Sequence, residues 1–177
     1  MKKELSIFKK NIELSFFYSE DLVSESELQD YEENLSRLCI CFDTFLKDSE
    51  KLFKDLFVIN LNISTNPEIR DINFEYRNKN KVTDVLSFPM QENLRNGHYD
   101  EIIPEIELGD IFISKSVCEE QAREFNLSYM EEFVHLVTHG FLHLCGYDHE
   151  ISDKEEKLME ANEESILNKF TKLKISS

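Results

Sequence analysis

The spacing of hydrophobic positions predicts five helices along this chain of 177 residues. The first begins at the capping pair Ser24 and Glu27, and its apolar positions recur at steps of three and four as far as Phe45. Asn66-Pro67 opens the second helix, which ends near Arg77, because proline is favoured at the first helical position. The remaining three helices are expected over residues 115–126, after the capping pair Ser128 and Glu131, and from Ser152 to about Phe170.

Alternating apolar and polar residues predict the strands of one sheet. In the segment 58–64, Ile59, Leu61 and Ile63 fall on one side, which is the period of two typical of a half-buried strand. Because strands and helices do not alternate strictly, the sequence predicts an α+β fold. We expect a single domain over residues 1–177, with about five helices packed against a roughly four-stranded mixed sheet. The other strands are predicted around residues 12–16, near 84–88 and over 106–113.

The helix that follows Ser128 is apolar around most of its circumference, which predicts that it lies buried at the centre of the domain. It carries the pattern H-x3-H-x5-H, formed by His139, His143 and His149. Two histidines four residues apart lie on one helix face, about 6 Å apart along the axis, so their ring nitrogens can share a metal ion. Gly146 is the residue best able to end the helix and return His149 to the same ion.

These three histidines are therefore predicted to hold one metal ion per chain, with zinc as the expected metal. A lone histidine on an apolar helix is more often a packing residue, but here three of the five histidines in the chain fall in one motif. His135 lies about 12 Å from His143 along the axis and is expected to support the site without ligating. Three protein ligands leave a fourth position for water, which is typical of catalytic zinc; Cys145 or Asp148 would fill it in a structural site.

The formal charge of −16 argues against a general nucleic-acid binder, which is normally basic. The charge is uneven, however, because Arg77, Lys79 and Lys81 occur together without an acidic neighbour. Such a local basic segment is compatible with selective RNA binding. The alternative interpretation is a solvated loop.

Other classes of protein are disfavoured by composition. The four cysteines include no CxxC pair, which argues against a disulfide framework or a zinc ribbon. No apolar run has the length of a signal peptide or of a membrane helix. We therefore expect a soluble, cytoplasmic protein that contacts no membrane.

Four segments of the chain form a recognisable set of motifs: NFEYR at 73–77, TDVLSFP at 83–89, LGDI at 108–111 and HLVTHGFLHLCGYDHE at 135–150. On these motifs the chain resembles the YbeY endoribonucleases, metal-dependent bacterial RNases of ribosomal RNA maturation. The resemblance covers about residues 59–150 and departs from the family at Val82, where proline is frequent. It implies a single-strand-specific endoribonuclease of ribosomal RNA processing, including 16S rRNA 3′-end maturation, and of ribosome quality control. It also implies single-stranded or ribosomal RNA and small-subunit components as partners, and no DNA.

The same resemblance favours a catalytic role for Arg77, whose guanidinium would donate a bidentate pair of hydrogen bonds to a phosphate. On composition alone, the alternative role for Arg77 is a surface salt bridge. Asp84 and Asp110 are candidates for supporting positions in the cleft or for turn residues. Two rival functions stay open. A metzincin-like metal hydrolase or peptidase shares the histidine spacing, but Gly140 stands where those enzymes carry the glutamate general base. The other rival is a non-catalytic, ribosome-associated zinc protein.

Overall fold

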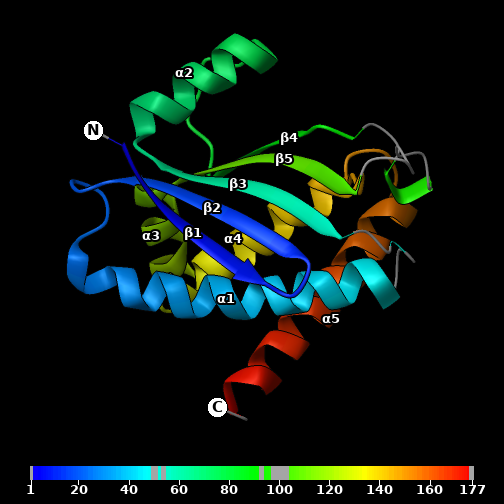
Figure 1. Ribbon diagram of the computed structural model, residues 1–177. Coiled ribbons are helices and arrows are strands. Elements are labelled where there is room, and N and C mark those ends of the chain that lie inside the picture. The colour runs from blue at the N-terminus through cyan, green and yellow to red at the C-terminus, as the bar shows by residue number, and fades with distance from the viewer. Residues whose placement is uncertain (1, 49–51, 53–54, 92–93, 97–103, 176–177) are drawn as a thin grey trace.

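A mixed sheet of five strands forms the centre of the computed structural model, which describes residues 2–48, 52, 55–91, 94–96 and 104–175 (Figure 1). The strand order is β1-β2-β3-β5-β4. The pairs β2–β3 and β3–β5 are parallel, whereas β1 and β4 run antiparallel to their neighbours at the two edges. The strands are β1 Lys2–Lys9, β2 Ile12–Ser19, β3 Leu56–Ser64, β4 Val85–Pro89 and β5 Glu105–Ser114.

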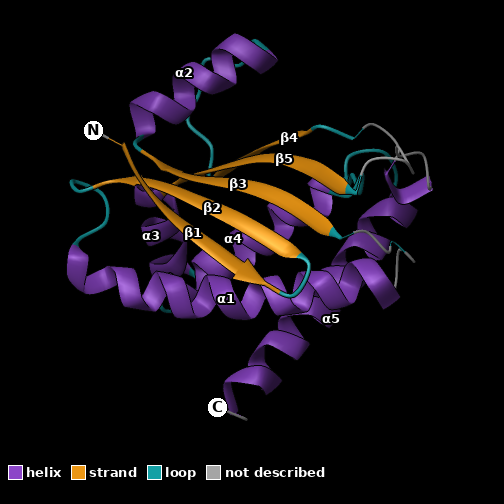
Figure 2. Ribbon diagram, in the orientation of Figure 1, coloured by secondary structure: helices purple, strands orange, loops and turns teal. Residues whose placement is uncertain are grey.

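Four of the five α-helices lie on one face of the sheet, and α2 lies on the other (Figures 1 and 2). Helix α4 packs against β4 and β5, and α5 lies against α1 and α4, so α4 is enclosed between the sheet and another helix. The helices are α1 Glu25–Asp48, α2 Asn66–Arg77, α3 Lys115–Glu124, α4 Tyr129–Leu144 and α5 Asp153–Ile175, with a short 3-10 helix at Leu94–Asn96.

Aromatic side chains fill the core between α1 and α4. The rings of Phe42 on α1 and Phe141 on α4 stack with centroids 3.8 Å apart and planes 8° apart. Nearer the start of α4, the ring of Phe133 meets Tyr31 edge to face at 5.0 Å. All four rings are fully buried. Such close packing fixes the position and rotation of α4, because interiors of this density leave little room for movement.

The predicted α+β class and the five helices are confirmed, but the sheet has five strands where about four were expected. The additional strand is β1, which pairs with β2 along its whole length. Its sequence, KKELSIFK, is rich in charge, and its burial alternates only between exposed and partly exposed positions apart from Ile7. Lysines on an edge strand also protect it from pairing with other chains. The strand was missed because half-exposed edge strands carry a weak hydrophobic pattern.

No helix in the described part of the chain is both long enough and apolar enough to cross a membrane. All four cysteines are reduced and buried. Burial raises the pKa of the Cys39 thiol to about 12, so this thiol stays protonated and behaves as a small apolar side chain.

Candidate metal centre

Both ends of α4 are fixed by local sequence. At its start, the Ser128 hydroxyl accepts a hydrogen bond from the Glu131 amide, and the Glu131 carboxylate accepts one from the Ser128 amide, which is the predicted capping box. At its end, Gly146 has a φ of +96°, and its amide donates to the carbonyl of His143. The amide of Tyr147 donates to the carbonyl of Leu142. This pair of bonds is a Schellman motif, which turns the chain back beside the helix as expected.

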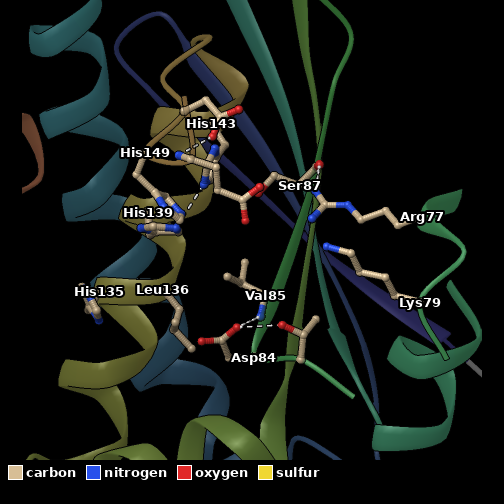
Figure 3. A pocket seen from close by; sticks show the side chains of 13 residues that line it. Arg77, Lys79, Asp84, Val85, Ser87, His135, Leu136, His139, His143 and His149 are labelled. Atoms are coloured by element: carbon tan, nitrogen blue, oxygen red, sulfur yellow. Dashed lines mark hydrogen bonds between the residues drawn. The ribbon is translucent and has the colours of Figure 1, made fainter. Parts of the chain in front are cut away.

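The reversal brings the three predicted histidines together. One ring nitrogen from each of His139, His143 and His149 lies within 4.8 Å of the other two. The Nε2 atoms of His139 and His143 are 3.1 Å apart, and the His149 ring lies 5.3 Å from each of the other two ring centroids. Figure 3 shows the three rings converging on one side of a cavity.

This group fits a metal ion in its donor chemistry and its charge. Burial, reinforced by the neighbouring His139 and His149, lowers the pKa of His143 to about 4. The ring is therefore neutral at physiological pH, which is the form that ligates a metal. Three imidazoles are a donor set that zinc accepts. Among the described residues the group contains no fourth member: Cys145 is completely buried, and neither it nor Asp148 contributes a ligand atom.

Gly140 lies where α4 approaches the sheet most closely. A Cβ atom at this position would lie 2.9 Å from the Cγ2 of Ile111 on β5 and 3.2 Å from the Oγ of Ser87 on β4. The position that follows the first histidine therefore faces β4 and β5, and it is not among the residues that line the cavity. A glutamate there would have no room, so the general base of a metzincin has no equivalent at this position.

The opposite wall of the cavity is basic. The cavity measures about 650 Å³, and its lining includes Arg77 and Lys79 as well as the three histidines. In Figure 3 the Arg77 and Lys79 side chains extend toward the histidines from the far side of the sheet edge. The Arg77 Nη2 atom donates a hydrogen bond to the carbonyl of Ser87, 3.2 Å away, and its guanidinium carbon lies 5.9 Å from the ring centroid of Phe88.

The loop that follows Arg77 and carries Lys79 and Lys81 is held by Asn73, which is buried in α2. Its side-chain amide donates to the carbonyl of Lys81 at 2.8 Å. Asn78 ends the helix in the left-handed conformation, with a φ of 55°. Lys79 and Lys81 are exposed, and neither forms an ion pair with a described residue. Their charges are thus available to an anionic ligand.

The two aspartates singled out from the sequence have different positions. Asp84 lines the cavity, but its carboxylate accepts hydrogen bonds from the Gln121 side chain at 3.0 Å and from the Val85 amide at 2.8 Å. Burial opposes its ionisation, yet these bonds leave its pKa below the usual value. Asp84 therefore links β4 to α3. Asp110 does not line the cavity, because Ile111 faces α4 and strand alternation places Asp110 on the opposite face of the sheet.

Comparison with known proteins identifies the family. A family model described as Endoribonuclease YbeY matches residues 19–171. The chain belongs to the YbeY endoribonuclease family. Curated relatives of that name include one from Sulfurihydrogenibium sp., 42% identical over 132 residues, which are 72% of this chain and 82% of the relative. Another, from Aquifex aeolicus, is 46% identical over 110 residues, which are 62% of this chain and 68% of the relative.

A solved structure also matches the fold. The solution structure of TM1509 from Thermotoga maritima is 28% identical, with a TM-score of 0.55, and the match covers 87% of this chain and 88% of that one. The YbeY family model includes α5 almost to its end, although the sequence motifs that indicated the family stop at residue 150. Helix α5 therefore belongs to the YbeY domain, and it contributes to the site.

That contribution is a carboxylate that sequence reasoning missed. The Oε1 atom of Glu163 on α5 lies 3.3 Å from the Nδ1 of His139 and 3.6 Å from the Nε2 of His135. The other ring nitrogen of His135 lies 3.3 Å from the carboxylate of Glu132, which is itself buried. The contact with the Glu163 carboxylate raises the pKa of His135 to about 9, with both glutamate charges adding to the effect. His135 is thus outside the ligand group and is a cation between two carboxylates.

Proposed function

We propose that this protein is a metal-dependent endoribonuclease that cuts single-stranded RNA in ribosomal RNA processing, with 16S rRNA 3′-end maturation and ribosome quality control as its setting. The main support for this proposal is that three convergent imidazoles and two cations, Arg77 and Lys79, line one cavity. That combination suits a phosphodiester, whose charge needs both a Lewis acid and hydrogen-bond donors. Residues 1–177 would form a single catalytic domain of a cytoplasmic protein, with small-subunit components among its partners.

The metal in this proposal is one zinc ion per chain, held by His139, His143 and His149. When bound, zinc supplies Lewis acidity toward phosphoryl oxygens. The neutral state of His143 and the convergence of the three ligand atoms support this ligand set. The motif spacing and the donor chemistry support zinc over harder cations, which prefer oxygen ligands.

Arg77 is the proposed catalytic residue of the chain itself. Its guanidinium uses one donor on the carbonyl of Ser87, which orients the planar group at the edge of the cavity. The remaining donors are directed along a fixed fork, the geometry that matches two oxygens of a phosphate. As negative charge increases on those oxygens in the transition state, positioned donors stabilise it. A lysine could not reproduce this arrangement because it offers a point charge.

A single-stranded substrate is supported by an aromatic ring beside the cations. Tyr76, which directly precedes Arg77, is exposed to 66% and contacts Phe88 at a centroid distance of 5.2 Å. Its ring therefore packs edge to face with one aromatic neighbour while much of its surface is open. Aromatic rings next to cations are typical of sites that stack unpaired bases and hold the backbone by charge. Duplex RNA keeps its bases stacked internally and gains nothing from such a ring.

The two rival functions are disfavoured. A metzincin-like peptidase requires a carboxylate after the first histidine, and Gly140 faces the sheet at 2.9 Å from Ile111. A structural zinc site requires a fourth protein ligand, and the described residues supply three. The family name of the matched relatives agrees with the nuclease.

The test is cleavage of a single-stranded RNA by the purified protein, with a casein-like protein as the rival substrate. We expect RNA cleavage that stops when zinc is removed by a chelator and returns when zinc is restored, and no casein hydrolysis. Peptide hydrolysis without RNA cleavage would overturn the proposal. RNA cleavage that persists in a His139→Ala variant would show that the activity comes from another source.

A further inference from the structure

The carboxylate of Glu163 lies on the otherwise apolar face of α5 that packs against the core. The face of α5 that meets the core includes Met159 and Ile166, which are only 2% and 3% exposed, and the partly buried Phe170. These positions follow steps of seven and four residues, and Glu163 falls between the first two on the same face. Its side chain is 17% exposed. A mostly buried carboxylate is costly unless it is paired, so a glutamate at this position requires a partner.

The partners are two histidines of α4, one turn apart. The Oε1 atom of Glu163 lies 3.3 Å from His139 Nδ1 and 3.6 Å from His135 Nε2. A carboxylate accepts hydrogen bonds, so the Nδ1 of His139 is the nitrogen that carries the proton. The Nε2 of the same ring is then unprotonated, and it is the Nε2 that lies 3.1 Å from the Nε2 of His143. The contact with α5 thus selects the tautomer whose free lone pair points into the histidine group.

We propose that Glu163 is a positioning residue of the metal centre, which fixes the tautomer and the ring orientation of His139 from a separate helix. His135 holds the carboxylate in place from its other side and is in turn held by Glu132, 3.3 Å from its Nδ1. Carboxylates hydrogen-bonded to metal-bound imidazoles commonly perform this role in metalloproteins. The inference rests on the proposed function in one respect, because it needs the three histidines to bind a metal.

Zinc affinity, measured by competition with a chromophoric chelator, tests this inference without any RNA. Glu163→Leu keeps an apolar stripe on α5 but removes the acceptor, and we expect zinc to bind about 10- to 100-fold more weakly. Glu163→Gln keeps the shape and one acceptor oxygen, so its loss should be smaller. The matched control is Glu164→Gln, which removes the same charge from the exposed neighbouring position and should stay within about twofold of the parent.

A second readout separates positioning from a general loss of structure. In long-range ¹H–¹⁵N spectra of the zinc-loaded parent, we expect the His139 ring to carry its proton on Nδ1, and Glu163→Leu to lose or broaden that signal while the spectrum of His143 remains. If Glu163→Leu does not fold, Glu163→Gln decides by the same two measurements. Parent-like affinity and an unchanged His139 spectrum in the folded variants would overturn the inference. A parent that binds zinc as described but cuts no RNA would overturn the proposed function alone.

Discussion

The two walls of the cavity are built in opposite ways. The histidine wall is a buried helix that is capped at both ends, stacked on aromatic rings and enclosed by the sheet and α5. The cationic wall is the exposed end of α2 and the loop after it, where Arg77 is held by one hydrogen bond to Ser87 and Lys79 is exposed. Rigid elements suit ligands that must meet one ion, whereas exposed side chains are accessible to a flexible strand. Changes to the first wall should therefore affect metal and stability, and changes to the second should affect activity alone.

The largest effect is expected from His143→Ala. Loss of one of three ligands should abolish stoichiometric zinc binding, because two imidazoles hold the ion far less tightly. Elemental analysis of the dialysed protein measures this directly, with Glu164→Gln on the exposed side of α5 as the control that keeps its zinc. Full zinc in His143→Ala would refute the ligand set.

Arg77→Lys should separate the two walls. The variant keeps the positive charge but loses the bidentate hydrogen-bond geometry of the guanidinium. Removal of one positioned donor typically costs about 3 kcal/mol of transition-state stabilisation, or about a hundredfold in rate. Zinc content and thermal unfolding should match the parent, because the residue is outside both the core and the histidine group. Single-turnover cleavage measures the effect. A cleavage rate equal to that of the parent would show that Arg77 is not catalytic, and only the metal ligands would remain assigned to the site.

Gly140→Ala tests how closely the histidine wall approaches the sheet. The added methyl group would lie 2.9 Å from Ile111 Cγ2, and overpacking of this kind costs about 1–3 kcal/mol. The better helix propensity of alanine offsets up to about 1 kcal/mol of that. Urea unfolding should therefore show a net loss of free energy of unfolding, whereas a gain would mean that α4 can move away from the sheet at no cost.

The charge network behind the site predicts a pH effect on the metal-free protein. The pKa of His135 is about 9 in the folded state against an ordinary value of 6.5. Folding thus favours the protonated ring: its contribution to stability is complete below about pH 6.5 and is lost as the pH rises through about 9. His135→Gln should remove this decline between pH 6.5 and 9. Parallel stability curves for the two proteins would contradict the assignment.

The smallest effect is expected from Lys79→Ala. Lys79 is exposed and forms no ion pair with a described residue, so it should contribute one phosphate contact, and its loss should weaken RNA binding modestly. The slope of the logarithm of affinity against the logarithm of salt concentration should fall by about 0.7 for a single strand. An unchanged slope would show that Lys79 does not contact an RNA phosphate.

Local patterns in the sequence predicted most of the fold. The capping pair at Ser128 and Glu131 and the helix end at Gly146 placed α4 correctly because these signals act within a few residues. The proximity of the three histidines also followed from spacing on one helix and its turn. The edge strand β1 was missed because only Ile7 of it is buried.

Local sequence patterns could not predict contacts between elements that are far apart along the chain. Glu163 is one acid among many on α5, and only the packing of α5 on α4 shows that it reaches His139. A carboxylate inside an otherwise apolar stripe with Met159 and Ile166 was the available signal. Similarly, Gly140 could be recognised as a missing general base but not as the point of closest approach to Ile111. The sequence allowed Asp110 either a supporting position in the cleft or a place in a turn, because it does not show which face of β5 meets α4.

The central claim is that the two walls act together as one zinc-dependent site. The most direct measurement is the single-turnover rate of RNA cleavage while zinc is titrated into the metal-free protein, for the parent and for Arg77→Lys. We expect the rate to rise linearly to one zinc per chain in both proteins, with Arg77→Lys reaching a plateau about a hundredfold lower at the same stoichiometry. Cleavage by the metal-free parent, or equal plateaus for the two proteins, would contradict the claim.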